Sequence, residues 1–213
     1  GGVQKVVASR HHDFYFMEDG SLFASGENDG ARLGSNSDKG DRFLSLPSEI
    51  FDSNISNISS LNGSTLIIKN DNSLWVTGWN GYGQLGTGNT ENVGDPVKID
   101  HDVTAIASRY HSLYTKTDGS LWAIGRNNRG QLGDGTTMDR HLPVKVVDEN
   151  VTAVEAGWEF SLFMKSDGSV WSMGSHNKGR LGFGGKGDQH SPVKIMTSGA
   201  RSISAHSGSG YII

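Results

Sequence analysis

The sequence predicts an all-β fold made of repeated antiparallel strands. A segment that starts with Asp and ends in Leu-Gly occurs four times along the 213 residues. The stretches around it are short, rich in Val, Ile, Leu and aromatic residues, and bounded by turn residues, which is typical of strands. No window keeps the 3.6-residue period of an amphipathic helix. The length suits one substantial domain.

The four repeats align without gaps and set the period of the chain. They read DGSLFASGENDGARLG, DNSLWVTGWNGYGQLG, DGSLWAIGRNNRGQLG and DGSVWSMGSHNKGRLG, and their first residues Asp19, Asp71, Asp118 and Asp167 are 52, 47 and 49 residues apart. A period close to 50 is typical of propeller blades. We therefore expect a β-propeller or a propeller segment, with a solenoid of hairpins as the alternative.

The third unit illustrates the strands expected in each repeat. VTAIA begins at Val103, HSLYTK covers 111–116, SLWAI covers 120–124, and LPVKV follows the glycine-rich loop at 142–146. Asp118-Gly119 between the second and third stretches predicts a two-residue hairpin turn of type I′, in which both central residues have positive φ. Each unit therefore has about three to four strands.

The repeats predict a single repeat domain over residues 1–213. Its units cover approximately 1–50, 51–98, 99–146, 147–196 and a partial fifth, 197–213. Both ends are expected to be cut from a longer sequence. The closing apolar GYII would leave an open strand edge, so we expect further blades or self-association through open propeller edges.

Several predicted strands are apolar on both faces, such as the one that contains Leu66, Ile67 and Ile68. A strand with one solvent-exposed face should alternate between hydrophobic and polar residues, so these sheets are expected to lie between neighbouring sheets. Trp75, Trp122 and Trp171 fall at one repeat position and are expected to pack between blades.

Composition excludes several classes of partner. Nineteen Lys and Arg residues stand against 23 Asp and Glu residues, and the net charge of −4 predicts no nucleic acid and no membrane binding. Without cysteine there is no disulfide or thiolate metal site. The chain shows no secretory signal and no long apolar run, and both a cytoplasmic and a secreted bacterial location stay open.

No motif in the sequence predicts catalysis. GRNNRGQLGDGTT at 125–137 looks like a phosphate loop, but Gln131 and Leu132 stand where Lys and Ser or Thr are required. The eight histidines form no metal-binding spacing, and no nucleophile elbow is present. His12 and His111 share a position that Ser or Phe fills in other units, which predicts a loop-anchoring or surface role. We expect no enzyme, no cofactor and no metal.

The pattern H-S-L-x-x-x-x-D-G-S-L-W-x-x-G-x-N-x-x-G-Q-L-G at 111–133 resembles the repeat of the regulator of chromosome condensation family, and the resemblance covers the chain in four units. It implies a β-propeller of four-stranded blades, usually seven. The founding activities of that family are guanine-nucleotide exchange on a small GTPase, through an inserted hairpin, and chromatin binding through a basic tail. The units here differ in length by at most five residues and no basic tail is present, so neither feature is expected. Other members bind protein partners on one face of the ring, which suits this chain better.

Positions that vary between equivalent loops are the candidates for partner recognition. One loop set follows the strand-ending glycine and begins at 27, 79, 126 and 175; the other joins the first two strands at 10–11, 62–63, 109–110, 158–159 and 207–208. Their large side chains are of the types that anchor protein interfaces. The candidate partner-binding residues are Trp79, Tyr82, Arg109, Tyr110, Arg126, Arg129, Trp158 and Glu159. The alternative is that the tryptophans pack on neighbouring loops and the arginines are solvated.

The sequence thus predicts a non-enzymatic propeller scaffold that binds a protein partner through variable loops on one face. The first alternative is a guanine-nucleotide exchange factor or other regulator of a small GTPase. The second is a fragment with a purely structural or self-assembly role. A glycoside-hydrolysing propeller is the enzyme alternative.

Overall fold

The computed structural model describes residues 2–8, 12–29, 32–34, 43–51, 53–206 and 208–213. They form four four-stranded antiparallel sheets and one two-stranded sheet, so the all-β prediction is confirmed. The first two sheets contain β1 (Val3–Ala8), β2 (His12–Met17), β3 (Leu22–Glu27), β4 (Phe43–Phe51), β5 (Ile55–Leu61), β6 (Ser64–Lys69), β7 (Leu74–Gly78) and β8 (Val93–Asp100). The next two contain β9 (Val103–Ser108), β10 (His111–Lys116), β11 (Leu121–Gly125), β12 (Arg140–Val147), β13 (Val151–Ala156), β14 (Phe160–Lys165), β15 (Val170–Gly174) and β16 (Gln189–Met196). The last contains β17 (Ile203–Ala205) and β18 (Gly210–Ile212).

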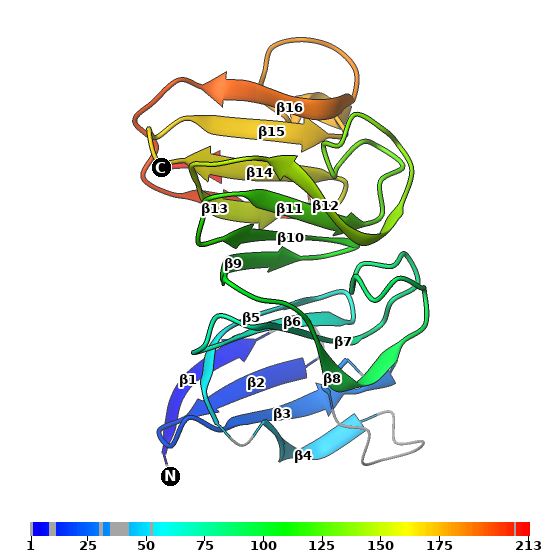
Figure 1. Ribbon diagram of the computed structural model, residues 1–213, viewed down its shortest axis with the longest axis vertical. Coiled ribbons are helices and arrows are strands. Elements are labelled where there is room, and N and C mark those ends of the chain that lie inside the picture. The colour runs from blue at the N-terminus through cyan, green and yellow to red at the C-terminus, as the bar shows by residue number, and fades with distance from the viewer. Residues whose placement is uncertain (1, 9–11, 30–31, 35–42, 52, 207) are drawn as a thin grey trace.

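The four four-stranded sheets stack in chain order, from the first at the bottom of Figure 1 to the fourth at the top. Within each sheet every strand pairs with the strands next to it in sequence. The leading strands β5, β9, β13 and β17 contact one another in succession, which places them on the inner side of the stack. This is the blade arrangement of a β-propeller. Among the described residues no helix is long and apolar enough to cross a membrane.

Hydrophobic cores lie between consecutive sheets. Tyr114 of β10 packs with Leu66 and other residues of the second sheet. Its sequence neighbour Leu113 points to the opposite face and packs with Phe163 of the fourth sheet. Because successive side chains of a strand point to opposite faces, a sheet with a neighbour on each side needs apolar residues at both. The expectation that two-faced apolar strands lie between sheets is confirmed.

The hairpin turns differ from the predicted type I′. The Gly119 N–H donates to the Lys116 carbonyl at 2.9 Å, and the Lys116 N–H donates to the Ser120 carbonyl at 3.0 Å. Within residues 117–119 of this turn, only Gly119 has positive φ, at 78°. The loop therefore has three residues, a type I turn followed by a left-handed residue. The two-residue prediction was wrong because the Asp118 carboxylate accepts the Ser120 N–H at 2.9 Å, which holds this Asp outside the left-handed region.

The tryptophans at the shared repeat position are half-buried rather than fully enclosed. Trp122 packs against the core between the second and third sheets. Its indole N–H donates to Ser120 Oγ at 2.9 Å, and its ring stacks on Tyr114 with 6.3 Å between the centroids. The ammonium of Lys116 lies over the ring at 5.1 Å. Trp122 therefore covers the edge of the core, and Lys116 in turn covers the outer side of its ring.

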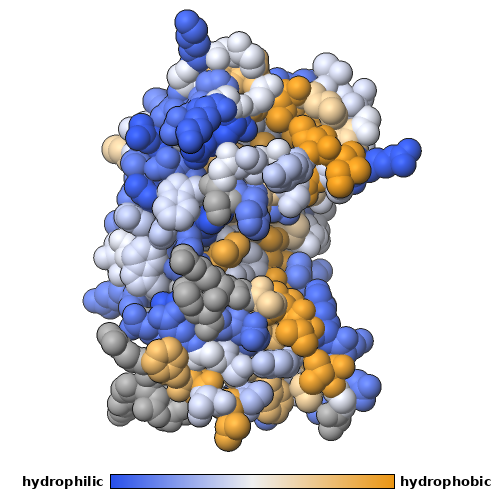
Figure 2. All heavy atoms as spheres, turned by 180° about the vertical axis from the view of Figure 1, so that it is seen from behind, coloured by the Kyte–Doolittle hydropathy of each residue, from blue (hydrophilic) through white to orange (hydrophobic). Residues whose placement is uncertain are grey.

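The outer strands carry isolated hydrophobic side chains. Leu46 on β4 is 75% exposed and Leu142 on β12 is 63% exposed. Seen from behind, much of the surface is hydrophilic, and hydrophobic side chains gather in a band along one side of the molecule (Figure 2).

Candidate functional site

Both sets of variable loops lie at the same end of the sheets. The loops that follow β7 and β11 extend to the right in Figure 1, where β9 also ends. Backbone hydrogen bonds join the two loop sets within each sheet: Trp79 N–H to Gly63 O at 2.8 Å, Arg126 N–H to Tyr110 O at 3.1 Å, and Ser175 N–H to Glu159 O at 2.8 Å. The variable positions therefore share one face. Residues 10–11, 30 and 207, which belong to these loops, lie outside the described residues.

Four aromatic side chains on this face form a continuous series, which we call the aromatic row: Tyr82, Trp79, Tyr110 and Trp158. The Trp79 ring lies 5.3 Å from Tyr82 and 6.0 Å from Tyr110. Tyr110 lies 5.2 Å from Trp158. Every contact is edge-to-face, the geometry that aromatic quadrupoles favour. The row links loops of three consecutive sheets. Trp158 is 40% exposed, and the other three are half-buried.

Two arginines stack on the aromatic row. The Arg126 guanidinium carbon lies 5.1 Å from the Tyr82 centroid and 5.7 Å from that of Tyr110. The Arg109 guanidinium carbon lies 5.3 Å from the Trp158 centroid. Arg109 is only 7% exposed, and its burial lowers the pKa of the guanidinium. These arginines are held in fixed cation–π positions rather than freely solvated.

The remaining two predicted residues lie at the border of the aromatic row. Glu159 is 4.0 Å from the Arg126 guanidinium, and both side chains are largely buried. Arg129 is half-exposed and pairs with Asp188 of the following loop at 3.4 Å. Arg129 and Glu159 also line a pocket of about 320 Å³ with His176 and Asp188. Seven of the eight predicted residues therefore come together directly, and Arg129 lies one pocket away.

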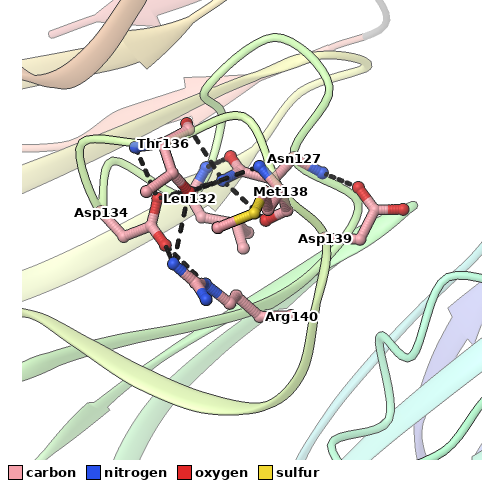
Figure 3. A network of polar contacts seen from close by, with 7 residues as sticks. All are labelled: Asn127, Leu132, Asp134, Thr136, Met138, Asp139 and Arg140. Atoms are coloured by element: carbon pink, nitrogen blue, oxygen red, sulfur yellow. Dashed lines mark hydrogen bonds and ion pairs between the residues drawn. The ribbon is translucent and has the colours of Figure 1, made fainter.

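The loop that carries Arg126 and Arg129 is organised around the buried side chain of Asn127 (Figure 3). Asn127 Oδ1 accepts the Leu132 N–H at 3.0 Å. Asn127 Nδ2 donates to Asp134 Oδ1 at 3.0 Å and to the Met138 carbonyl at 3.1 Å. Asp134 in turn forms an ion pair with Arg140 at 2.6 Å. One side chain thus satisfies several loop groups at once and fixes the loop on the end of β11.

Next to Trp158, a cavity of about 660 Å³ opens along the inner strands. Its described lining residues are Val7, Ala8, Ile58, Ser59, Ser60, Leu61, Asn62, Arg109, Trp158, Ala205 and His206. Asn62 has the left-handed φ of 53°, and its Nδ2 is buried with no hydrogen-bond partner among the described residues. Position 62 belongs to a predicted variable loop, but Asn62 is not among the eight candidate residues. Its only available signal was the repeat position that it shares with Arg109.

The histidines at the shared repeat position, His12 and His111, form buried hydrogen bonds between neighbouring sheets. His111 is fully buried, and its Nε2 lies 2.7 Å from Ser161 Oγ of the next sheet. His12 makes a similar contact with Ser60 Oγ at 2.7 Å, although Ser60 lies on the first strand of the next sheet rather than on the second. The predicted loop-anchoring role is confirmed and the surface alternative is wrong, because Ser161 Oγ also donates to the Gln131 carbonyl of a glycine-rich loop at 2.7 Å. Across the described ranges, no group of three or more His, Asp or Glu residues could hold a metal ion.

Comparison with known proteins assigns the repeats. The model of the regulator of chromosome condensation (RCC1) repeat matches residues 71–113, 118–164 and 167–213. A second model of the same repeat matches 104–131 and 151–180. No curated protein sequence matches the chain.

Solved structures share the fold. The structure of Prp20p from Saccharomyces cerevisiae, described with its binding to Gsp1p and histones, has a TM-score of 0.83 and 22% identity over 97% of this chain and 54% of that one. Yeast RCC1 (Prp20) bound by Kap60 gives 0.84 and 21% identity over 99% of this chain and 53% of that one. Human WBSCR16 gives 0.63 and 16% identity over 96% of this chain and 70% of that one. The four-stranded propeller blades are thus confirmed, and the chain spans about half the length of the Prp20 chains.

Proposed function

Because the chain belongs to the regulator of chromosome condensation repeat family, we propose that it is a non-enzymatic propeller scaffold that binds a protein partner through the variable-loop face. The observation that carries the proposal is the aromatic row. Its four residues come from loops whose backbones repeat, yet their aromatic side chains are absent from equivalent positions of other units. The repeated scaffold does not account for them.

The roles of the residues follow from their exposure and contacts. Trp158, at the end of the aromatic row, has the largest exposed fraction of the four and acts as the main anchor. Trp79, Tyr82 and Tyr110 hold it in place and add contact area. Arg109 and Arg126 orient the partner, and Arg129 with Glu159 forms a polar rim. Tryptophan, tyrosine and arginine are the residue types that dominate the energy of protein interfaces, because they bury large areas and form directional contacts.

A catalytic role is not part of this proposal. The His111–Ser161 pair has the spacing of a base and a nucleophile, but both side chains are fully buried between sheets. Burial lowers the pKa of His111 to about 3, so this imidazole is a poor proton acceptor. The pair supports a structural role.

The proposal is tested by isolating a partner and measuring its affinity. The tagged chain captures binding proteins, and the tightest is purified and titrated. We expect Trp158→Ala to weaken binding by about 2 kcal/mol or more, as at interface hot spots. Leu142→Ala, which also removes an exposed hydrophobic side chain but lies on outer strand β12, is the matched control. Equal affinities of both variants and the parent chain would refute the proposal.

Nucleotide exchange on a small GTPase is the first alternative. Prp20p, which has the same fold, is described as binding Gsp1p. This alternative predicts faster release of a labelled guanine nucleotide from a GTPase when the chain is added. Release at the uncatalysed rate across a panel of small GTPases would leave the scaffold function in place.

Self-assembly is the second alternative. Tyr211 on the edge strand β18 is 61% exposed, and the adjoining Ile213 is 78% exposed. An uncovered strand edge can pair with another chain. Sedimentation over a concentration series separates the alternatives: self-assembly raises the mass with concentration, whereas a scaffold that acts alone keeps a constant mass.

A further inference from the structure

The cavity beside Trp158 is lined in part by side chains that can donate hydrogen bonds. Arg109, Asn62 and His206 supply its nitrogen-bearing side chains, and none of its described lining residues is Asp or Glu. Glu155 lies nearby, where it accepts the Ala205 N–H at 3.4 Å, and burial raises the pKa of that carboxyl. The cavity wall is therefore suited to a negatively charged group.

Arg109 is arranged to receive such a group. Its guanidinium is stacked on Trp158 at 5.3 Å and is 93% removed from solvent, since only 7% of the residue is exposed. Stacking restricts the conformations of the guanidinium before a ligand binds, so less conformational entropy is lost on binding. The planar N–H groups of a guanidinium match the two oxygens of a carboxylate. Burial also strengthens the attraction, because little water screens it.

Asn62 supplies an independent indication. Its Nδ2 is buried in the cavity wall, yet it donates to no atom of the described residues. Buried donors are normally paired, so an unpaired one invites an acceptor from outside the chain. The acceptor that suits both Asn62 and Arg109 is an oxygen anion.

The rest of the wall is suited to an aliphatic stem. Ile58, Leu61, Val7 and the Trp158 ring border the same space, whose volume of about 660 Å³ falls within the range of compact ligand pockets. A Glu or Asp side chain combines a short apolar stem with a terminal carboxylate.

We propose that this cavity receives an acidic segment of the protein partner, with one carboxylate held by Arg109 and Asn62 against Trp158. The inference rests on the proposed function and names the chemistry of the partner. A protein is favoured over a nucleic acid because Glu159, the sequence neighbour of Trp158, and Asp188 line a second pocket. A phosphate backbone that crosses the face would meet both carboxylates, whereas a single inserted side chain avoids them.

The test measures binding of a fluorescein-labelled hexaglutamate peptide by anisotropy, with hexaglutamine as the neutral peptide and hexathymidylate as the nucleic acid. Hexaglutamate should bind best. Arg109→Gln should weaken it by about tenfold or more, the effect of losing a hydrogen-bonded charge. Arg201→Gln removes the same charge from an exposed site outside the cavity and is the matched control.

Asn62 allows a second pair of variants that keeps the fold. Asn62→Gly tolerates the left-handed backbone and removes the side chain together with its donor, and Asn62→Asp replaces the amide with a carboxylate. We expect a moderate loss of hexaglutamate binding for the first and a larger loss for the second.

Three results would overturn the inference: hexaglutamate binding no tighter than hexaglutamine, equal losses in Arg109→Gln and Arg201→Gln, or tighter binding of hexathymidylate. Titration of a captured partner separates this failure from failure of the proposed function. If binding of the partner depends on Trp158 but not on Arg109 or Asn62, the scaffold proposal stands and the acidic-segment proposal is refuted. If binding does not depend on Trp158, both proposals are refuted.

Discussion

The Arg109 guanidinium lies 5.3 Å from the centre of the Trp158 ring, although the two residues belong to consecutive sheets. Each occupies the variable loop between the first two strands of its unit, at positions that the repeat places side by side. The contact therefore joins two blades through residues that the repeat itself does not require.

The first prediction concerns the strength of this contact. A double-mutant cycle with Arg109→Gln and Trp158→Leu should give a coupling free energy of about 0.5–2 kcal/mol, the range of cation–π pairs. Urea denaturation of the four proteins supplies the free energies of unfolding. Strict additivity of the two substitutions would mean that the stacked geometry contributes nothing.

The second prediction concerns the glycine-rich loop. Asn127→Ala should lower the free energy of unfolding by about 2–3 kcal/mol, because the Leu132 N–H and the Met138 carbonyl lose a buried partner together. Its neighbour Asn128 is exposed, so Asn128→Ala should change stability by less than about 0.5 kcal/mol. Comparable losses in the two variants, measured by urea denaturation, would show that the network does not hold the loop.

The third prediction concerns pH. Folding keeps His111 neutral down to about pH 3, whereas in the unfolded chain it titrates near 6.5. Between these values the unfolded state binds more protons, so the contribution is complete above pH 6.5 and is lost as the pH falls toward 3. The slope should be about 1.4 kcal/mol per pH unit.

Urea denaturation of the parent chain and two variants between pH 3 and 7 checks this. His111→Gln should flatten the dependence. His101→Gln should keep it, since the His101 side chain is 70% exposed. If the free energy of unfolding of the parent chain did not change with pH across that window, the buried, neutral state of His111 would be contradicted.

The fourth prediction concerns two glycines with positive φ, Gly119 in a hairpin turn and Gly179 in the glycine-rich loop after β15. Gly179→Ala meets no atom within 4 Å but must adopt φ of 74°, and it should cost about 1 kcal/mol. Gly119→Ala has similar φ, and its Cβ would also lie 2.6 Å from the Asn150 backbone nitrogen, so its cost should be clearly larger. Thermal or urea unfolding gives both values, and the reverse order would argue against the close approach.

Repetition explains why much of this structure could be predicted from the sequence. Apolar residues such as Leu113 and Tyr114 recur in every unit and indicate strands that are covered on both faces. The turn type could not be read from Asp118-Gly119, because it depends on a hydrogen bond from Ser120 to the Asp carboxylate. The candidate site residues were selected by their variation between units, and their mutual stacking was not predicted. Distances such as that between Tyr110 and Trp158 depend on how neighbouring sheets pack.

The location of the binding face is the central claim, and hydrogen–deuterium exchange with a captured partner tests it most directly. We predict slower exchange on binding in residues 79–85, 109–111, 126–133 and 157–160. These segments carry the aromatic row and its arginines. The three-residue turns at 117–119 and 166–168, at the other end of the sheets, should be unchanged. Protection confined to those turns would contradict the account.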